Sequence, residues 1–181
     1  NPDMMSLWVL LEENVINNND LRFAEQLGSD ATGRYMPYWT RSEKGAQKDA
    51  MIPPEIIKEA SKSGKYLPPY EIKGWGDFYL FPKNRNQDSI SEPFPYEVQG
   101  KEVLESSLMS VVNKGGKFLG VVGTDYSMKS LTDEFLKYRP VGGYAILLSE
   151  GGQIVAHSEK PDLAGKMMSE DAELTSQAAQ L

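Results

Sequence analysis

The sequence predicts an α+β fold in which an antiparallel sheet is flanked by helices. Two observations support this fold class. Residues 103–112 and 117–124 are strand-like apolar segments, and the turn sequence Asn-Lys-Gly-Gly separates them. Residues 143–157 repeat this arrangement, with GYAILLS and QIVAH on either side of a Glu-Gly-Gly turn. Both patterns are typical of β-hairpins, so we expect these neighbouring strands to pair antiparallel.

A helix is expected directly after the second strand. Met128, Leu131 and Phe135 lie at positions i, i+3 and i+7, which places them on one helical face. Ser127 precedes this pattern and is a suitable N-cap residue. We therefore expect a helix over residues 127–138 that bridges two structural units.

The remaining elements are predicted to be short. The apolar run at 7–12 indicates a strand, residues 21–27 a single helical turn, and residues 56–61 a short helix. Alternating prolines make residues 92–98 extended, so residues 94–124 would form a three-stranded meander. Because a lone hairpin is not stable by itself, we expect a first module over 1–138 and a truncated second module over 139–181.

Composition excludes several classes of function. The 181 residues include no cysteine, a single histidine (His157) and a formal net charge of −7. Disulfide frameworks, zinc ribbons and thiol catalysis are therefore excluded, and no basic cluster favours a nucleic-acid partner. No apolar run approaches the roughly 20 residues that a membrane span requires. Common hydrolase, protease and nucleotide-binding motifs are absent, so we predict no enzyme activity, cofactor or metal.

The order of these segments resembles the double-Cache (dCache) sensor domains. The resemblance rests on EPFPYEVQGKEVLESS, GGKFLGVVGTDYSMKSL and GGYAILLSEGGQIVAHSEKPDLAGK, and it covers about residues 30–166. It implies two stacked PAS-like modules, each with a twisted antiparallel sheet and flanking helices, and a long N-terminal helix that is absent here. It also implies the periplasmic sensor of an inner-membrane chemotaxis receptor or histidine kinase. Such a receptor is homodimeric and anchored by transmembrane helices outside this chain.

In this family, the amino-acid signature uses an Arg-x-Trp-Tyr segment for the ligand carboxylate and the last Asp of GVxGxD for the ligand amine. Asp125 matches that Asp, whereas the spacing places Gly76 at the arginine position. Phe78 and Tyr79 replace Trp-Tyr. Burying a ligand carboxylate without a cation would cost several kcal/mol. An organic cation fits better, because each aromatic face would contribute about 0.5–2 kcal/mol.

The resemblance therefore implies an aromatic, acidic site for a polyamine, a biogenic amine or a quaternary amine. Its predicted ligand-binding residues are Tyr38, Trp39, Trp75, Asp77, Tyr79, Glu92, Phe94, Tyr96, Ser107 and Asp125. A purine, an amino acid, or a structural domain without any small ligand are the alternatives.

Individual residues also have simpler interpretations. The rings of residues 35–39 would equally pack in the core, and Asp77 would equally be a solvated loop carboxylate. Asp125 would equally stabilise the start of the following helix through the helix dipole. If the domain is a sensor, we expect the helix at 127–138 to move when the pocket closes.

Overall fold

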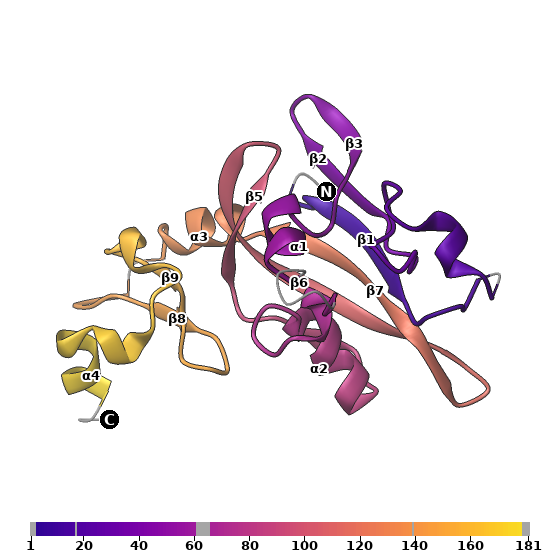
Figure 1. Cartoon of the computed structure of the whole chain (residues 1–181). Coiled ribbons are helices and arrows are strands. Elements are labelled where there is room, and N and C mark those ends of the chain that lie inside the picture. Colours follow the sequence, from indigo (N-terminus) through magenta and orange to yellow (C-terminus); the bar gives the residue numbers. More distant parts are fainter. Residues whose placement is uncertain (1–2, 17, 61–65, 139, 179–181) are drawn as a thin grey trace. The chain divides into compact units, whose positions relative to one another are not determined.

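The computed structural model describes residues 3–16, 18–60, 66–138 and 140–178 (Figure 1). These residues form two compact units. The sheet unit contains residues 4–91 and 107–125, and the hairpin unit contains Asp3 together with residues 92–106 and those from 126 onward. Both units are discontinuous in sequence, whereas the predicted modules have one boundary at residue 138. The assignment of a ligand-binding module and a second module stays a prediction.

The main sheet is antiparallel wherever its strand pairs are defined, and its strand order is β3-β2-β1-β7-β6-β4, with β5 paired to β6. Its strands are β1 (Ser6–Leu11), β2 (Tyr38–Ser42), β3 (Gly45–Asp49), β4 (Ser89–Ile90), β5 (Phe94–Val98), β6 (Lys101–Lys114) and β7 (Lys117–Ser127). The predicted meander of β5, β6 and β7 is confirmed. The predicted α+β class, an antiparallel sheet with few helices, is also confirmed.

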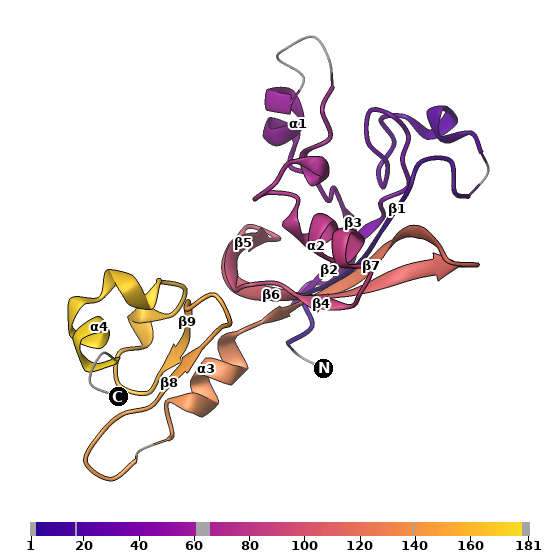
Figure 2. The same ribbon diagram turned by 90° about the horizontal axis from the view of Figure 1, so that it is seen from below.

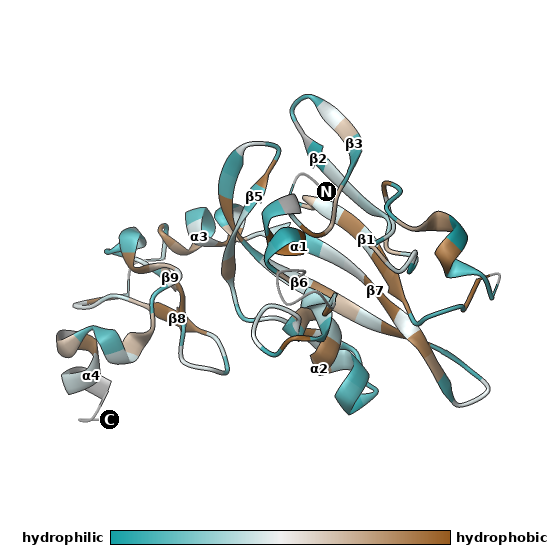
Figure 3. Cartoon of the chain, viewed as in Figure 1, coloured by the Kyte–Doolittle hydropathy of each residue, from teal (hydrophilic) through white to brown (hydrophobic). Residues whose placement is uncertain are grey.

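The helix α2 (Asp77–Arg85) lies against one face of the sheet unit, and the helix α1 (Pro54–Ala60) lies on the same side but farther from the strands (Figure 2). Side chains alternate along β1, so Trp8 is buried on the face covered by α2 and Leu7 is half-exposed on the opposite face. The Trp8 ring meets the Phe78 ring of α2 edge-on, with a centroid distance of 5.3 Å. Apolar residues accordingly gather along β1, β7 and α2 (Figure 3).

The hairpin unit contains the predicted second hairpin. β8 (Ile146–Leu148) and β9 (Ile154–His157) pair antiparallel. Ile154 packs with Leu163 and Leu174 in a small apolar core. Leu174 belongs to α4 (Ala172–Ala178), a helix that the sequence did not predict because its residues show no clear apolar period.

The helix predicted to bridge two units lies within the hairpin unit, and it begins later and ends earlier than expected. It is α3 (Lys129–Phe135), and Met128 is its N-cap residue. The prediction of Ser127 as N-cap is wrong because β7 continues through that residue. The Ser127 hydroxyl instead accepts a hydrogen bond from the backbone N–H of Lys129 at 3.1 Å. The predicted helical turn at 21–27 is a 3₁₀ turn at Asp20–Phe23.

Candidate functional site

Asp125 lies near the end of β7, and only 4% of its surface is exposed. Three neutral side chains donate hydrogen bonds to its carboxylate. Oδ1 accepts from Trp8 Nε1 at 3.1 Å and from the Ser107 hydroxyl at 2.7 Å, and Oδ2 accepts from the Ser6 hydroxyl. The donors come from β1 and β6, the two strands next to β7, so the sheet itself builds this cluster.

Gly123 is the residue that makes room for Trp8. Trp8 and Gly123 are register partners across β1 and β7, and the indole ring lies over the glycine. A Cβ atom at position 123 would lie 2.1 Å from an indole carbon, so no side chain fits there without displacing Trp8. Gly123, the second glycine of the GVVGTD motif, thus lets Trp8 keep one of the three hydrogen bonds to Asp125.

The Asp125 carboxylate has no cationic partner in the described parts of the chain. Arg34 and Lys83 pair with acidic residues at another site, and Lys129 and Lys137 pair with acidic residues of α3. A buried carboxylate with only neutral partners is costly. A cationic ligand would supply the missing opposite charge.

An aromatic chain extends from this carboxylate toward α2. Phe78 contacts Trp8, and Trp75 meets Phe78 with a centroid distance of 5.7 Å. Tyr38 is buried and is the register partner of Trp8 on β2, so it lies on the same face of the sheet. Tyr38, Trp75 and Ser107 are therefore the predicted residues that share this face with Asp125.

Gly76 occupies a position where no arginine fits. A Cβ atom there would lie 2.3 Å from the backbone oxygen of Tyr70 and 2.9 Å from that of Ile72. Both are backbone atoms, which cannot move aside as a flexible side chain does. The packing of this turn before α2 therefore excludes the arginine of the amino-acid signature.

The structure places other predicted residues away from the carboxylate. Trp39 pairs with Leu7 and is 48% exposed, so it lies on the opposite face of the sheet from Trp8. Asp77 accepts a hydrogen bond from the backbone N–H of Gly74 at 2.9 Å, which stabilises the turn before α2. Tyr79 is buried, and its hydroxyl bonds to Glu12.

Three predicted residues belong to the hairpin unit. Glu92 accepts a hydrogen bond from the backbone N–H of Gly151 at 3.0 Å. Phe94 and Tyr96 are neighbours on one side of β5, with an edge-on ring contact of 6.2 Å. Their involvement in a ligand site stays a prediction.

The sheet unit also has a cleft of about 570 Å³, but this cleft lies on the face away from Asp125. Leu7, Ile90, Leu108 and Val122 are among its lining residues. Trp8 and Asp125 are both almost fully buried on the other face. Access to the carboxylate therefore requires Trp8 or α2 to move.

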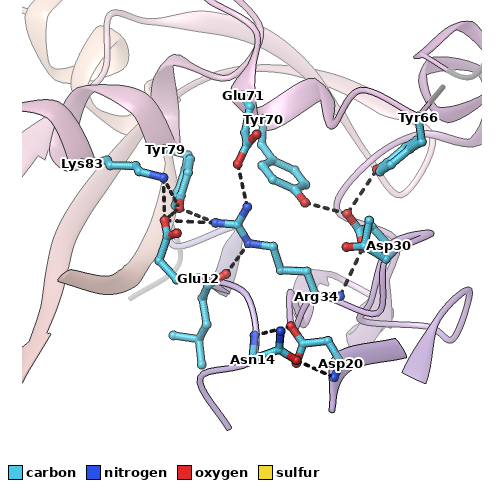
Figure 4. Close-up of polar contacts among 12 residues, drawn as sticks. Glu12, Asn14, Asp20, Asp30, Arg34, Tyr66, Tyr70, Glu71, Tyr79 and Lys83 are labelled. Atoms are coloured by element: carbon cyan, nitrogen blue, oxygen red, sulfur yellow. Dashed lines mark hydrogen bonds and ion pairs between the residues drawn. The ribbon is translucent and has the colours of Figure 1, made fainter. Parts of the chain in front are cut away.

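Sequence reasoning missed a second buried charge, Arg34 (Figure 4). Its side chain is 2% exposed and forms ion pairs with Glu71 at 2.8 Å and with Glu12 at 3.2 Å. Its guanidinium also stacks on the rings of Tyr70 and Tyr79, at 4.8 and 5.0 Å from their centroids. Burial alone would lower the pKa of Arg34, but these tyrosines and carboxylates raise it.

The Arg34 cluster extends to α2 and to Asp30. Lys83 donates to Glu12 at 2.6 Å, and the Arg34 and Tyr79 groups also bond to that carboxylate. Asp30 accepts from the backbone N–H of Arg34 at 3.1 Å and from the Tyr70 hydroxyl. The one available sequence signal was an arginine between an Asp-x-Thr-Gly turn and an aromatic run. Arg34 is committed to two carboxylates.

The chain is similar to sensor domains of membrane receptors. Methyl-accepting chemotaxis protein TlpQ of Pseudomonas aeruginosa is 28% identical over 175 residues, which cover 92% of this chain. The extracellular domain of mmHK1S-Z3, a candidate histidine kinase, superposes with a TM-score of 0.71 at 26% identity over 99% of this chain. The chain is homologous to the chemoreceptor TlpQ, and its structural neighbours are sensor domains of chemoreceptors and histidine kinases. No family model matches it.

Two further structures show the same fold as this chain. The periplasmic sensory domain of the Campylobacter jejuni chemoreceptor Tlp1 has a TM-score of 0.58 at 14% identity, over 92% of this chain and 54% of that chain. The ligand-binding domain of the Pseudomonas aeruginosa amino acid chemoreceptor PctB, in complex with L-Gln, has a TM-score of 0.52 at 17% identity, over 93% and 51%.

The chain spans 23% of TlpQ and 59% of the mmHK1S-Z3 domain. Its relatives are extracellular or periplasmic sensor domains and not enzymes, so the predictions of an extracytoplasmic location and of no enzyme activity are confirmed. In the part of the chain that the structure describes, no helix is long and apolar enough to cross a membrane.

Proposed function

We propose that this domain is the ligand-binding region of a transmembrane chemoreceptor and binds an organic amine at Asp125 in the sheet unit. The observation that carries the proposal is the buried Asp125 carboxylate, which has three neutral donors and no cationic partner among the described residues. An ammonium group would supply the opposite charge through a charge-assisted hydrogen bond. The aromatic chain of Trp8, Phe78 and Trp75 would contact the rest of the cation.

Two features favour an amine without a carboxylate over an amino acid. Gly76 cannot carry the arginine of the amino-acid signature, because the backbone of Tyr70 fills the space. Arg34 already pairs with Glu12 and Glu71. PctB is solved with L-Gln and with L-Arg, and both ligands carry the ammonium group that we assign to Asp125.

The receptor context is part of the same proposal. The sheet unit would serve as the ligand-binding module, and the full receptor would be a homodimer anchored by transmembrane helices outside this chain and signal for chemotaxis. Ligand binding shifts a receptor only by its differential affinity for two conformations. We expect α3 to move on binding, so identical positions of α3 with and without ligand would contradict this step.

A thermal-shift screen of the whole chain tests the ligand class. The panel contains primary and quaternary amines, polyamines, purines, amino acids and organic acids. A ligand at a hundredfold excess over its Kd adds about 2.7 kcal/mol of stability, which corresponds to roughly 5–10 °C for a chain of this size. Shifts with amines support the proposal, shifts only with purines or amino acids replace the ligand class, and no shift contradicts a small-molecule site.

The Asp125→Asn variant tests the residue. We expect a loss of amine affinity of at least tenfold, because the charge-assisted hydrogen bond is lost. Asp88→Asn is the matched control, since Asp88 lies in the same unit and accepts from Ser110 and from the backbone of Val111. Equal amine affinity in the two variants would contradict the assignment of Asp125.

A further inference from the structure

We propose that Asp125 binds its ligand through Oδ2 alone, and that Trp8 and Ser107 thereby select ammonium ligands over guanidinium ligands. This inference rests on the proposed function and specifies the chemistry that the same site accepts. It follows from the distribution of hydrogen bonds between the two carboxylate oxygens.

The two oxygens of Asp125 are not equally available. An ionised carboxylate offers about four lone-pair positions, two on each oxygen. Both positions on Oδ1 are used, by Trp8 Nε1 at 3.1 Å and by the Ser107 hydroxyl at 2.7 Å. Oδ2 accepts one bond, from the Ser6 hydroxyl. The remaining position therefore lies on Oδ2.

The Trp8 donor is held firmly in place. Its indole ring lies against Gly123 on one strand and meets Phe78 edge-on at 5.3 Å. Ring packing of this kind adds to the area that a buried indole already removes from water. The Trp8 ring would have to leave both neighbours to lose its hydrogen bond to Oδ1. Both lone-pair positions on Oδ1 are therefore occupied when a ligand binds.

Ammonium and guanidinium groups place different demands on this carboxylate. A guanidinium binds a carboxylate best as a fork, with one N–H bond to each oxygen. With Oδ1 filled, this fork loses one of its two bonds. An ammonium group donates from a single nitrogen and needs only the open position on Oδ2. The site therefore favours the ammonium ligand.

The test is isothermal titration calorimetry of the whole chain with phenethylammonium and phenethylguanidinium, which share one aromatic arm. We expect the wild type to bind the ammonium probe about tenfold more tightly, because one charge-assisted hydrogen bond is at stake. Trp8→Phe and Ser107→Ala each vacate a position on Oδ1, so this preference should fall to about threefold or less. Ser107→Ala keeps the Trp8 packing and covers the case in which Trp8→Phe is poorly folded.

Ser6→Ala is the matched control because it vacates a position on Oδ2 and leaves Oδ1 filled. Its preference for the ammonium probe should equal that of the wild type. If Asp125→Asn weakens binding at least tenfold, an unchanged preference in Ser107→Ala, or an equal loss of preference in Ser6→Ala, overturns the selectivity mechanism alone. If neither probe binds the wild type, or Asp125→Asn binds both normally, the proposed function fails and the selectivity mechanism with it.

Discussion

The sheet unit buries two charged groups, Arg34 and Asp125, in opposite ways. Arg34 is surrounded by opposite charge, since Glu12 and Glu71 pair with it and Tyr79 bonds to it. Asp125 is surrounded by neutral donors only. In the first arrangement, carboxylates balance the charge of the buried arginine, which is expected of a structural ion-pair cluster. The second leaves a buried charge without its counterion, which is expected of a binding site. The difference predicts that Arg34 matters most for stability and Asp125 most for binding.

The largest stability effect is expected from Arg34→Met. Removing Arg34 leaves Glu71 without its cation and Glu12 with Lys83 alone. The loss of a buried ion-pair member costs up to about 3–5 kcal/mol. Lys129→Met is the control, because the Lys129–Asp133 pair is exposed and such pairs contribute about 0.3–0.5 kcal/mol. Denaturant unfolding measures both. A loss below about 1 kcal/mol in Arg34→Met would mean that the cluster is not structural.

A smaller loss of stability is expected from Gly123→Ala, because the added methyl group displaces the Trp8 ring. Overpacking of this kind costs about 1–3 kcal/mol, and the displaced indole should also give up its bond to Asp125. Thermal unfolding and tryptophan fluorescence report the two effects. Gly143→Ala is the control, since a Cβ atom there meets no other group within 4 Å. Unchanged fluorescence in Gly123→Ala would show that Trp8 does not depend on this glycine.

Asp125→Asn is expected to lower the free energy of unfolding by only about 1 kcal/mol. The hydroxyl groups of Ser6 and Ser107 can rotate to accept bonds from the new amide, so most of the cluster survives. Unfolding measured without ligand and calorimetry with an amine separate the two roles. A stability loss as large as that of Arg34→Met would make Asp125 a structural residue and remove the contrast between the clusters.

The smallest expected effect is a pH dependence at Glu12. Burial raises the pKa of Glu12, but hydrogen bonds from Lys83 and Tyr79 and the charge of Arg34 outweigh it and lower the pKa below its usual 4.5. A carboxyl group with a lowered folded-state pKa stabilises the fold above the unfolded value, and this stability is lost as the pH falls through the folded value. Glu12→Gln should therefore be less stable than wild type at neutral pH, and the gap should narrow below pH 4.5. A constant gap would contradict this origin.

Local patterns predicted much of this fold. The hairpins at 103–124 and 143–157 follow from residues that are adjacent in sequence, and Asp125 follows from one short motif. Arg34 could not be predicted this way, because its partners Glu12, Glu71 and Tyr79 lie 22, 37 and 45 residues away in the sequence. Such contacts depend on how distant segments pack.

The choice between neighbouring aromatic residues was also beyond the sequence. Tyr38 and Trp39 are consecutive on β2 and therefore point to opposite faces of the sheet. Their register against β1 pairs Tyr38 with Trp8 and Trp39 with Leu7, which puts Trp39 on the outer face. A pattern of aromatic residues identifies a strand, but only the pairing shows which ring shares a face with Asp125.

Asp125 and Ser107 have a further property that follows from the path of the chain. Ser107 and Asp125 are the first and the last residue of one segment of the sheet unit, and Ser106 and Tyr126 already belong to the hairpin unit. β7 and β6 continue through these points without a break. Asp125 is therefore joined to the hairpin unit by the backbone of β7 itself. If ligand binding shifts this part of β7, the covalent chain would carry the shift to Tyr126 without a relay of side chains.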